Sequence, residues 1–408
     1  MSNEIALLHQ LGREIMPVTD HSQMAYVLIE VSPTEVVAQV RMPLHLALVL
    51  DCSGSMHGKK WQSVKNAVKV VIDHLSPMDV ISVITFSGRA QTIIPSQPAR
   101  DPQGMKAYIE PLKAGGGTNM ARGMQLGLDE MFRWEETQAI KRMILLTDGR
   151  TSGSNKCRQL AINAREVGVM IYPLGIGGDW DEKLLDEIGV MSGGSEAEFV
   201  RHPDDAITIF QQQVQSAVDV VVRNALLTVQ FPQGVSPRRA IKVLPTISDL
   251  GASVLSDRRA VIPLGDLEKS RPPSILLELM VEPRSAGLFR IAQSEVSYDV
   301  PALGLSEQRI RDDILVTFSN AAMQEANAVV MNFVERVNAF RLVSKVLDEY
   351  RQSGKTTTRL AENVTRVLDA ETRTALEQIQ QGQSISQEQV KSIGNKTRKL
   401  TQRLDSIH

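Results

Sequence analysis

Cysteine is scarce in this sequence: the 408 residues include only Cys52 and Cys157. Two cysteines cannot build a disulfide framework, and their spacing matches no zinc-binding motif. Long hydrophobic runs are also missing, because no stretch approaches the roughly 18 apolar residues that a membrane-spanning helix needs. The first residues, MSNEIALLHQLGREIMPV, carry Glu4 where a signal peptide has basic residues, and they contain no long apolar core. We therefore expect a cytoplasmic protein without a membrane span.

The sequence also lacks an excess of either charge. Lys and Arg total 45 and Asp and Glu total 47, which gives a formal net charge of −2. That balance provides no overall attraction to nucleic acid or to an anionic membrane surface. Hydrophobic residues make up 42% of the chain and charged residues 23%, as in ordinary globular proteins. At about 150 residues per domain, this length predicts two or three domains.

Residues 43–217 alternate between apolar runs and amphipathic stretches. The runs HLALVLD, DVISVITF, RMILLTD and VMIYPLGIG are typical of fully buried β-strands. Between them, the stretches 61–75, 119–132 and 157–168 have the helical spacing of apolar residues. This alternation predicts an α/β fold with a doubly wound, mostly parallel sheet.

The segments on either side have a different pattern. Residues 1–42 are predicted to hold an N-terminal helix and strands, including two β-rich runs around the turn SPTE. Residues 218–304 contain short strands separated by Pro, Gly and Ser turns, which is typical of a β-sandwich. We expect the early strands to join this sandwich, so that the α/β unit is inserted between its strands.

Residues 305–408 are predicted to be helical, as a hairpin followed by a tail helix. The tail has side chains stepping by three and four at Val390, Ile393, Thr397, Leu400, Leu404 and Ile407. This stripe is shorter than the three or four heptads that indicate a coiled coil firmly. The apolar stripe still favours a tail helix that packs against a partner. A homo-oligomer formed through the C-terminal helices is one interpretation of this stripe.

Three loops of the predicted α/β unit carry oxygen-bearing side chains. DCSGS supplies Asp51, Ser53 and Ser55, GGGTN supplies Thr118, and LLTDG supplies Asp148. In an open parallel sheet, ligands bind beyond the carboxyl ends of the strands, where the strand order reverses. Two carboxylates and three hydroxyls are hard donors of the kind that Mg²⁺ prefers, and they leave coordination positions for water or an outside ligand. The sequence therefore predicts a magnesium site at this edge.

These three motifs, in this order, resemble the metal-ion-dependent adhesion site of a von Willebrand factor A domain, a Rossmann-like fold. The order of domains also resembles bacterial stand-alone A-domain proteins and inter-alpha-trypsin-inhibitor heavy chains. The resemblance implies that Ser53, Ser55 and Thr118 bind the metal directly. It implies that Asp51 and Asp148 act mostly through water, and that an Asp or Glu of a partner protein completes the site. Mn²⁺ or Ca²⁺ could replace Mg²⁺. The implied function is non-catalytic protein–protein interaction.

The sequence allows other interpretations. The motif could be purely structural, with Ser53 and Ser55 capping a loop and Asp148 accepting backbone hydrogen bonds. The protein could be a metal-independent scaffold or assembly factor that acts through its helices, for example beside an AAA+ ATPase. A metal-assisted phosphohydrolase is a third interpretation, although the sequence offers no nucleophile paired with a base. GIGGDW and SGKTTT resemble nucleotide-binding loops, but each lacks a glycine of the full motif.

Overall fold

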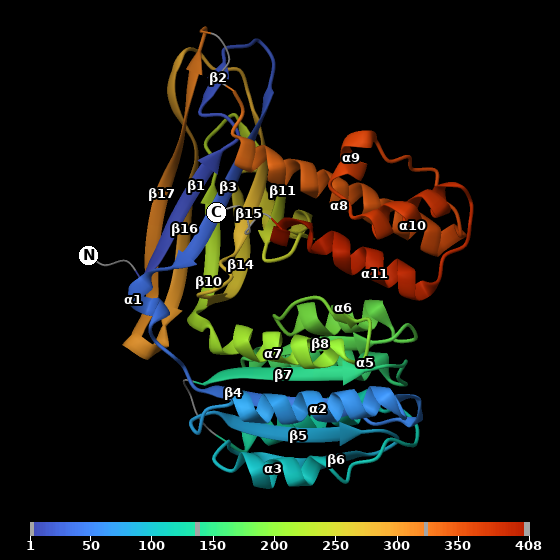
Figure 1. The fold of residues 1–408 in the computed structure, drawn as a ribbon. Helices are drawn as coiled ribbons and strands as arrows, with labels where there is room; N and C mark the ends of the chain where they lie inside the picture. Colours follow the sequence, from blue (N-terminus) through green and yellow to red (C-terminus); the bar gives the residue numbers. More distant parts are fainter. Residues whose placement is uncertain (1–3, 135–138, 322–324, 404–408) are drawn as a thin grey trace. The chain divides into compact units, whose positions relative to one another are not determined.

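A computed structural model of the chain describes residues 4–134, 139–321 and 325–403 (Figure 1). The chain divides into two compact units. One comprises Met1–Val40, Val220–Ser386 and Ile393–His408, and we call it the sandwich unit. The other comprises Arg41–Asp219 and Gln387–Ser392, and we call it the α/β unit. The α/β unit is inserted in the chain between strands of the sandwich unit, as the sequence predicts.

The sandwich unit contains two sheets. In spatial order, the first is β1 (Ile5–Leu11), β3 (Gln23–Pro33), β15 (Ser274–Val281), β11 (Val235–Leu244) and β12 (Ser248–Asp249). The second is β13 (Leu255–Ser256), β14 (Arg259–Glu268), β10 (Val220–Gln230), β16 (Gly287–Val300), β17 (Leu305–Ser319) and β2 (Ile15–Pro17). The N-terminal strand β3 pairs antiparallel with β15, which places Ile29 opposite Ile275. The predicted joining of the early strands to the sandwich is therefore confirmed.

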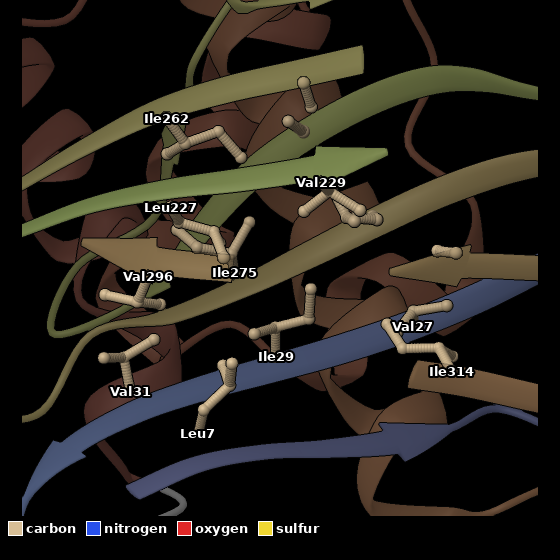
Figure 2. Packing of buried hydrophobic residues seen from close by; sticks show 14 of the residues in the cluster. Leu7, Val27, Ile29, Val31, Leu227, Val229, Ile262, Ile275, Val296 and Ile314 are labelled. Carbon is tan, nitrogen blue, oxygen red and sulfur yellow. The ribbon is translucent and has the colours of Figure 1, made fainter. Parts of the chain in front are cut away.

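Alternating side chains fill the space between these two sheets (Figure 2). Val27, Ile29 and Val31 of β3 are fully buried, and they contribute to one apolar cluster with Leu227 and Val229 of β10. A period of two puts one row of each strand into the core. This packing makes the two sheets one hydrophobic unit.

Helices complete the sandwich unit. They are α1 (Glu35–Ala38), α8 (Ala328–Ser353), α9 (Glu362–Arg366), α10 (Ala370–Gln380) and the later part of α11 (Gln387–Arg398), with 3₁₀ turns at Ala252–Val254, Pro301–Leu303 and Leu400–Arg403. Val330, Phe333 and Val337 of α8 are buried on one stripe. The predicted C-terminal helices are therefore present.

Three sequence predictions for this unit are wrong. The N-terminal segment forms strand β1 instead of a helix, because Ile5, Leu7 and Leu11 fill the sandwich core and the strand pairs with β3 along its whole length. The run after SPTE forms the short helix α1 instead of a strand. Residues 305–319 form the long strand β17, whose side chains Ile314, Val316 and Phe318 alternate into the core.

The last described residues pack on the sandwich unit. The Thr401 hydroxyl donates to the carbonyl of Val243, and the Arg336 guanidinium donates to the carbonyl of Leu400 at 2.7 Å. Ile393 and Leu400 are buried, so this part of the predicted tail stripe already has a partner within the sandwich unit. Leu404 and Ile407 lie outside the described residues. Among the described helices, none is long and apolar enough to cross a membrane.

The α/β unit has one six-stranded sheet with helices on both faces. The strands lie in the order β6 (Ala90–Pro98), β5 (Val80–Phe86), β4 (Leu44–Asp51), β7 (Ile140–Thr147), β8 (Val169–Ile176) and β9 (Glu198–Val200). The helices are α2 (Lys59–His74), α3 (Pro102–Ile109), α4 (Met120–Phe132), α5 (Ser154–Glu166), α6 (Glu182–Met191) and α7 (Asp205–Val218). Only the edge strand β6 is antiparallel to its neighbour, so the predicted doubly wound, mostly parallel sheet is confirmed.

The helices of this unit lie close to the strands. Helices α4, α5 and α6 share an apolar cluster with β4 and β5, while α2 and α7 pack against each other on the other face (Figure 1). A Cβ atom at Gly123 of α4 would lie 2.6 Å from the ring of Phe86. Only glycine permits this approach, which fixes α4 and the loop before it against the carboxyl end of β5.

Candidate metal centre

The candidate centre lies where the strand order of the α/β sheet reverses. Strand β4 has β5 on one side and β7 on the other, and the chain continues outward from each. All eight residues of β4 are buried, and the strand ends at Asp51. Strand β7 is buried except at Lys141, which is partly exposed, and is followed directly by Asp148. Parallel pairing of β4 with β7 brings these two ends together.

Asp51 is held at the base of the centre. Its side chain is fully buried, and its Oδ1 accepts a hydrogen bond from the backbone N–H of Ser53 at 2.8 Å. Its Oδ2 accepts from the hydroxyl of Thr147 at 2.6 Å. Burial raises the pKa of Asp51, and the negative charge of Asp148 acts in the same direction, while the bonds from Thr147 and Ser53 oppose the shift. The site therefore contains a carboxylate that is costly to ionise.

The two serines connect the two aspartates. The Oγ atoms of Ser53 and Ser55 lie 3.1 Å apart, and the Ser55 hydroxyl donates to Asp148 Oδ1 at 2.6 Å. A 3₁₀ turn at Gly54–Met56 follows Ser53 and directs Ser55 toward solvent. Ser53 is buried and Ser55 is exposed, so the chain of oxygens leads from the interior to the surface.

Thr118 lies on a loop that is bonded to this turn. The N–H of Gly54 donates to the carbonyl of Gly116 at 2.9 Å, and the N–H of Gly115 donates to the carbonyl of Cys52 at 2.7 Å. Gly116 has a φ of 93°, a conformation that favours glycine. Thr118 is half-buried at the end of this loop, just before α4. The three loops that carry the predicted residues are therefore adjacent.

Sequence reasoning missed two side chains of the centre. Thr147 holds Asp51, as described above. Lys60, in the first turn of α2, places its Nζ 2.7 Å from Asp148 Oδ2. The signal for Thr147 was its place beside Asp148 at the end of a buried strand. No sequence signal separates Lys60 from its neighbour Lys59, which forms an exposed ion pair with Asp204.

Other reactive groups near the centre are not arranged for nucleophilic chemistry. Burial raises the pKa of the Cys52 thiol, which keeps it in the unreactive protonated form at neutral pH. His57 is exposed, and its Nδ1 lies 2.7 Å from the carbonyl of Gly54. Among the described residues, no group of three or more His, Cys, Asp and Glu side chains gathers to hold a metal. The donors at this edge are oxygens, and an oxygen set of this kind could hold a hard cation.

The two nucleotide-loop look-alikes are packed turns. In GIGGDW, Trp180 is buried and donates its Nε1–H to the carbonyl of Gly177 at 2.7 Å. In SGKTTT, the Glu349 carboxylate accepts hydrogen bonds from the hydroxyls of Thr356 and Thr358 and from nearby backbone N–H groups. The Thr356 hydroxyl is the main cause that lowers the pKa of Glu349 to about 2. Both segments are thus occupied by contacts within the chain.

The contact between Thr147 and Asp51 makes a testable prediction. Thr147→Val keeps the shape of a fully buried side chain but removes the hydroxyl that donates to Asp51 Oδ2. We expect this variant to lose about 1.5–3 kcal/mol of unfolding free energy, as for other bonds to a charged group. Denaturant unfolding measures the loss, and Thr357→Val, at an exposed position, is the control. Equal stability of Thr147→Val and the original protein would contradict this role for the hydroxyl.

Comparison with known proteins identifies the fold of this unit. The sequence pattern of the von Willebrand factor type A domain family matches residues 45–215. An uncharacterized protein of Synechocystis sp. is 32% identical over 272 residues, which are 65% of this chain and 63% of that protein. Human inter-alpha-trypsin inhibitor heavy chain H4 is 25% identical over 321 residues, which are 76% of this chain and 31% of that protein. The chain thus spans less than two thirds of either relative.

Two solved structures have a similar fold over nearly the whole chain. A von Willebrand factor type A protein from Catenulispora acidiphila has a TM-score of 0.73 at 18% identity, covering 97% of this chain and 96% of that one. The ArnB paralog VWA2 from Sulfolobus acidocaldarius has a TM-score of 0.57 at 14% identity, covering 98% and 99%. Likeness at such identities concerns the fold alone. Together with the matched sequence pattern and the sheet described above, these findings identify residues 45–215 as a von Willebrand factor type A domain.

Proposed function

We propose that this protein is a non-catalytic interaction module that binds an acidic side chain of a partner protein through Mg²⁺. In this proposal Ser53, Ser55 and Thr118 bind the metal by their hydroxyls, while Asp51 and Asp148 hold metal-bound water. The partner's Asp or Glu replaces one further water. Mn²⁺ or Ca²⁺ could occupy the same oxygen set.

One observation carries this proposal: Ser53 and Ser55 connect two buried carboxylates at the carboxyl edge of the sheet, through the backbone N–H of Ser53 and the hydroxyls of both serines. The hydrogen bonds run from Asp51 through Ser53 and Ser55 to Asp148, and Ser55 is the exposed member of this series. An exposed hydroxyl allows a metal-bound position to face a partner. A divalent cation also offsets the repulsion between the two carboxylates that contributes to the raised pKa of Asp51. Domains of this family are commonly metal-dependent protein-interaction modules.

The geometry supports binding over hydrolysis. A serine nucleophile needs a general base within hydrogen-bond reach, usually a histidine. The described loop that carries Ser53 and Ser55 is followed by His57. The Nδ1 of His57 contacts the carbonyl of Gly54, and neither serine hydroxyl. Asp148 accepts from Ser55 but is neutralised by Lys60 on its other oxygen. We therefore propose that the protein has no enzymatic activity. We also propose that its interaction takes place in the cytoplasm.

Affinity capture tests this function. The full chain and its Ser55→Ala variant are used as baits in a native lysate, in Mg²⁺ and in EDTA, with capture read by mass spectrometry. We expect a protein that is captured only by the original chain in Mg²⁺. Ser236→Ala, at an exposed strand position in the sandwich unit, is the matched control and keeps the capture. Equal capture by all baits in both conditions would overturn the proposal, because the contact would then lie outside the metal centre.

A further inference from the structure

Lys60 is the one cation that directly contacts the hydrogen-bonded centre in the described part of the chain. Its Nζ lies 2.7 Å from Asp148 Oδ2, while Oδ1 of the same carboxylate accepts from Ser55. The Asp148 side chain has no exposed surface, and that of Lys60 is 31% exposed. The buried carboxylate therefore has both oxygens satisfied without any added ion.

The position of the Lys60 amine is defined by its surroundings. A Cβ atom at Gly177, in the loop after β8, would lie 3.5 Å from Lys60 Nζ. The amine thus lies between Asp148 and the backbone of this loop. The neighbouring Lys59 differs sharply, because its side chain is 71% exposed and its partner Asp204 is 67% exposed. An ion pair between such exposed groups contributes little, whereas the pair of Lys60 is largely removed from solvent.

The charges in the centre indicate that Lys60 affects the binding of the proposed metal. The ionised centre contains the negative charges of Asp51 and Asp148, and Lys60 compensates one of them. A divalent cation held by the serine hydroxyls would be beside the same Asp148 and would be repelled by the ammonium group. The Lys60 ammonium group and the divalent cation are both attracted to the carboxylate of Asp148. The presence of one therefore weakens the net attraction of the other.

We infer that Lys60 is an internal counter-ion that competes with the divalent cation for Asp148, keeping the metal-free centre folded and lowering its metal affinity. This inference rests on the proposed function, because it requires a metal at this centre. It has two consequences. Removing the positive charge should raise the metal affinity, and it should make the stability of the domain depend on the metal.

Metal titration of the full chain tests both consequences. Lys60→Gln keeps a donor for Asp148 but removes the charge, Lys60→Arg keeps the charge, and Lys59→Gln is the matched control. Isothermal titration with Mg²⁺ and Mn²⁺ should give a Kd for Lys60→Gln that is at least about tenfold lower than that of the original chain. The other two variants should stay close to the original. In EDTA, Lys60→Gln should unfold at a lower temperature, and Mg²⁺ should restore it.

Each outcome of this titration has a distinct meaning. If the original chain binds metal and Lys60→Gln binds it no more tightly, the inference about Lys60 is wrong and the proposed metal centre stands. If neither protein binds metal, the proposed function is wrong and the inference falls with it. If Lys60→Gln is too unstable to titrate without metal, its unfolding temperature decides: recovery in Mg²⁺ supports the inference, and no recovery overturns it. A gain in metal affinity in Lys60→Arg, which retains the charge, would also overturn it.

Discussion

Asp51→Asn is expected to lose divalent-cation binding while the metal-free protein keeps its stability. Asp51 is fully buried, and burial together with Asp148 raises its pKa, so the ionised side chain destabilises the metal-free fold. Asparagine retains an oxygen for the N–H of Ser53 and a group that can pair with Thr147. We expect metal affinity to fall by about 10- to 100-fold, as for other groups that hold metal-bound water.

Two measurements on the same samples separate these effects. Titration with Mn²⁺ gives the affinity, and thermal unfolding in EDTA gives the stability of the metal-free protein. Asp129→Asn, at an exposed position on α4, is the control and should change neither. Retained metal affinity in Asp51→Asn would remove Asp51 from the proposed centre. A large loss of stability in EDTA would instead support the interpretation that this motif is structural.

Acid is expected to destabilise the α/β unit through His45, at the start of β4. The side chain is fully buried, and burial followed by the nearby charge of Lys141 lowers its pKa to about 4. A lowered pKa means that the unfolded chain takes up a proton at a higher pH than the folded one. The stabilising effect of the neutral form is complete above the unfolded pKa of about 6.5 and declines as the pH falls toward 4. The loss approaches about 3 kcal/mol.

The histidine can be tested by comparing His45→Leu with the original protein. Denaturant unfolding at pH 7 and at pH 4.5 gives the acid-induced loss for each. The loss should be smaller in the variant by about 2–3 kcal/mol. Ser96 keeps a partner in the variant, since its hydroxyl also donates to the carbonyl of Glu130 at 2.7 Å. His74→Leu, at an exposed position, should behave like the original. The same acid-induced loss in both variants would refute the role of His45.

The parallel sheet could be predicted from sequence because its central strands are buried on both faces. Each reads as a short apolar run, and the alternation of such runs with amphipathic helical stretches is typical of a parallel sheet covered on both faces. Strand β17 carries Arg309, Arg311 and Asp313 on its solvent side, so its alternation is easily taken for one face of a helix. Strand β1 is ambiguous for a different reason: its pairing with β3 decides it, and pairing is not visible in a local pattern.

The candidate centre likewise contains residues that could be predicted from the sequence and one that could not. Asp51, Ser53, Ser55 and Asp148 could be named because they follow buried strands, and the structure connects them by hydrogen bonds. Lys60 could not be named, because Lys59 and Lys60 are identical in kind and adjacent in sequence. The direction of each side chain from the first turn of α2 distinguishes them. The sequence does not show which of the two lysines contacts Asp148, because this depends on the folded structure.

The insertion of the α/β unit also sets an order for folding during synthesis. Nearly all of this unit is one continuous stretch, Arg41–Asp219, so its whole sheet can form once that stretch has left the ribosome, before Gln387–Ser392 is made. Strand β3 can pair with β1 early, but its pairing with β15 must wait, because β15 lies beyond the whole insertion, with Ile29 opposite Ile275. Pairing over such a distance is slow. The nascent chain therefore carries a folded domain before its first strands have found their sheet, and those strands are the segment that needs protection from aggregation.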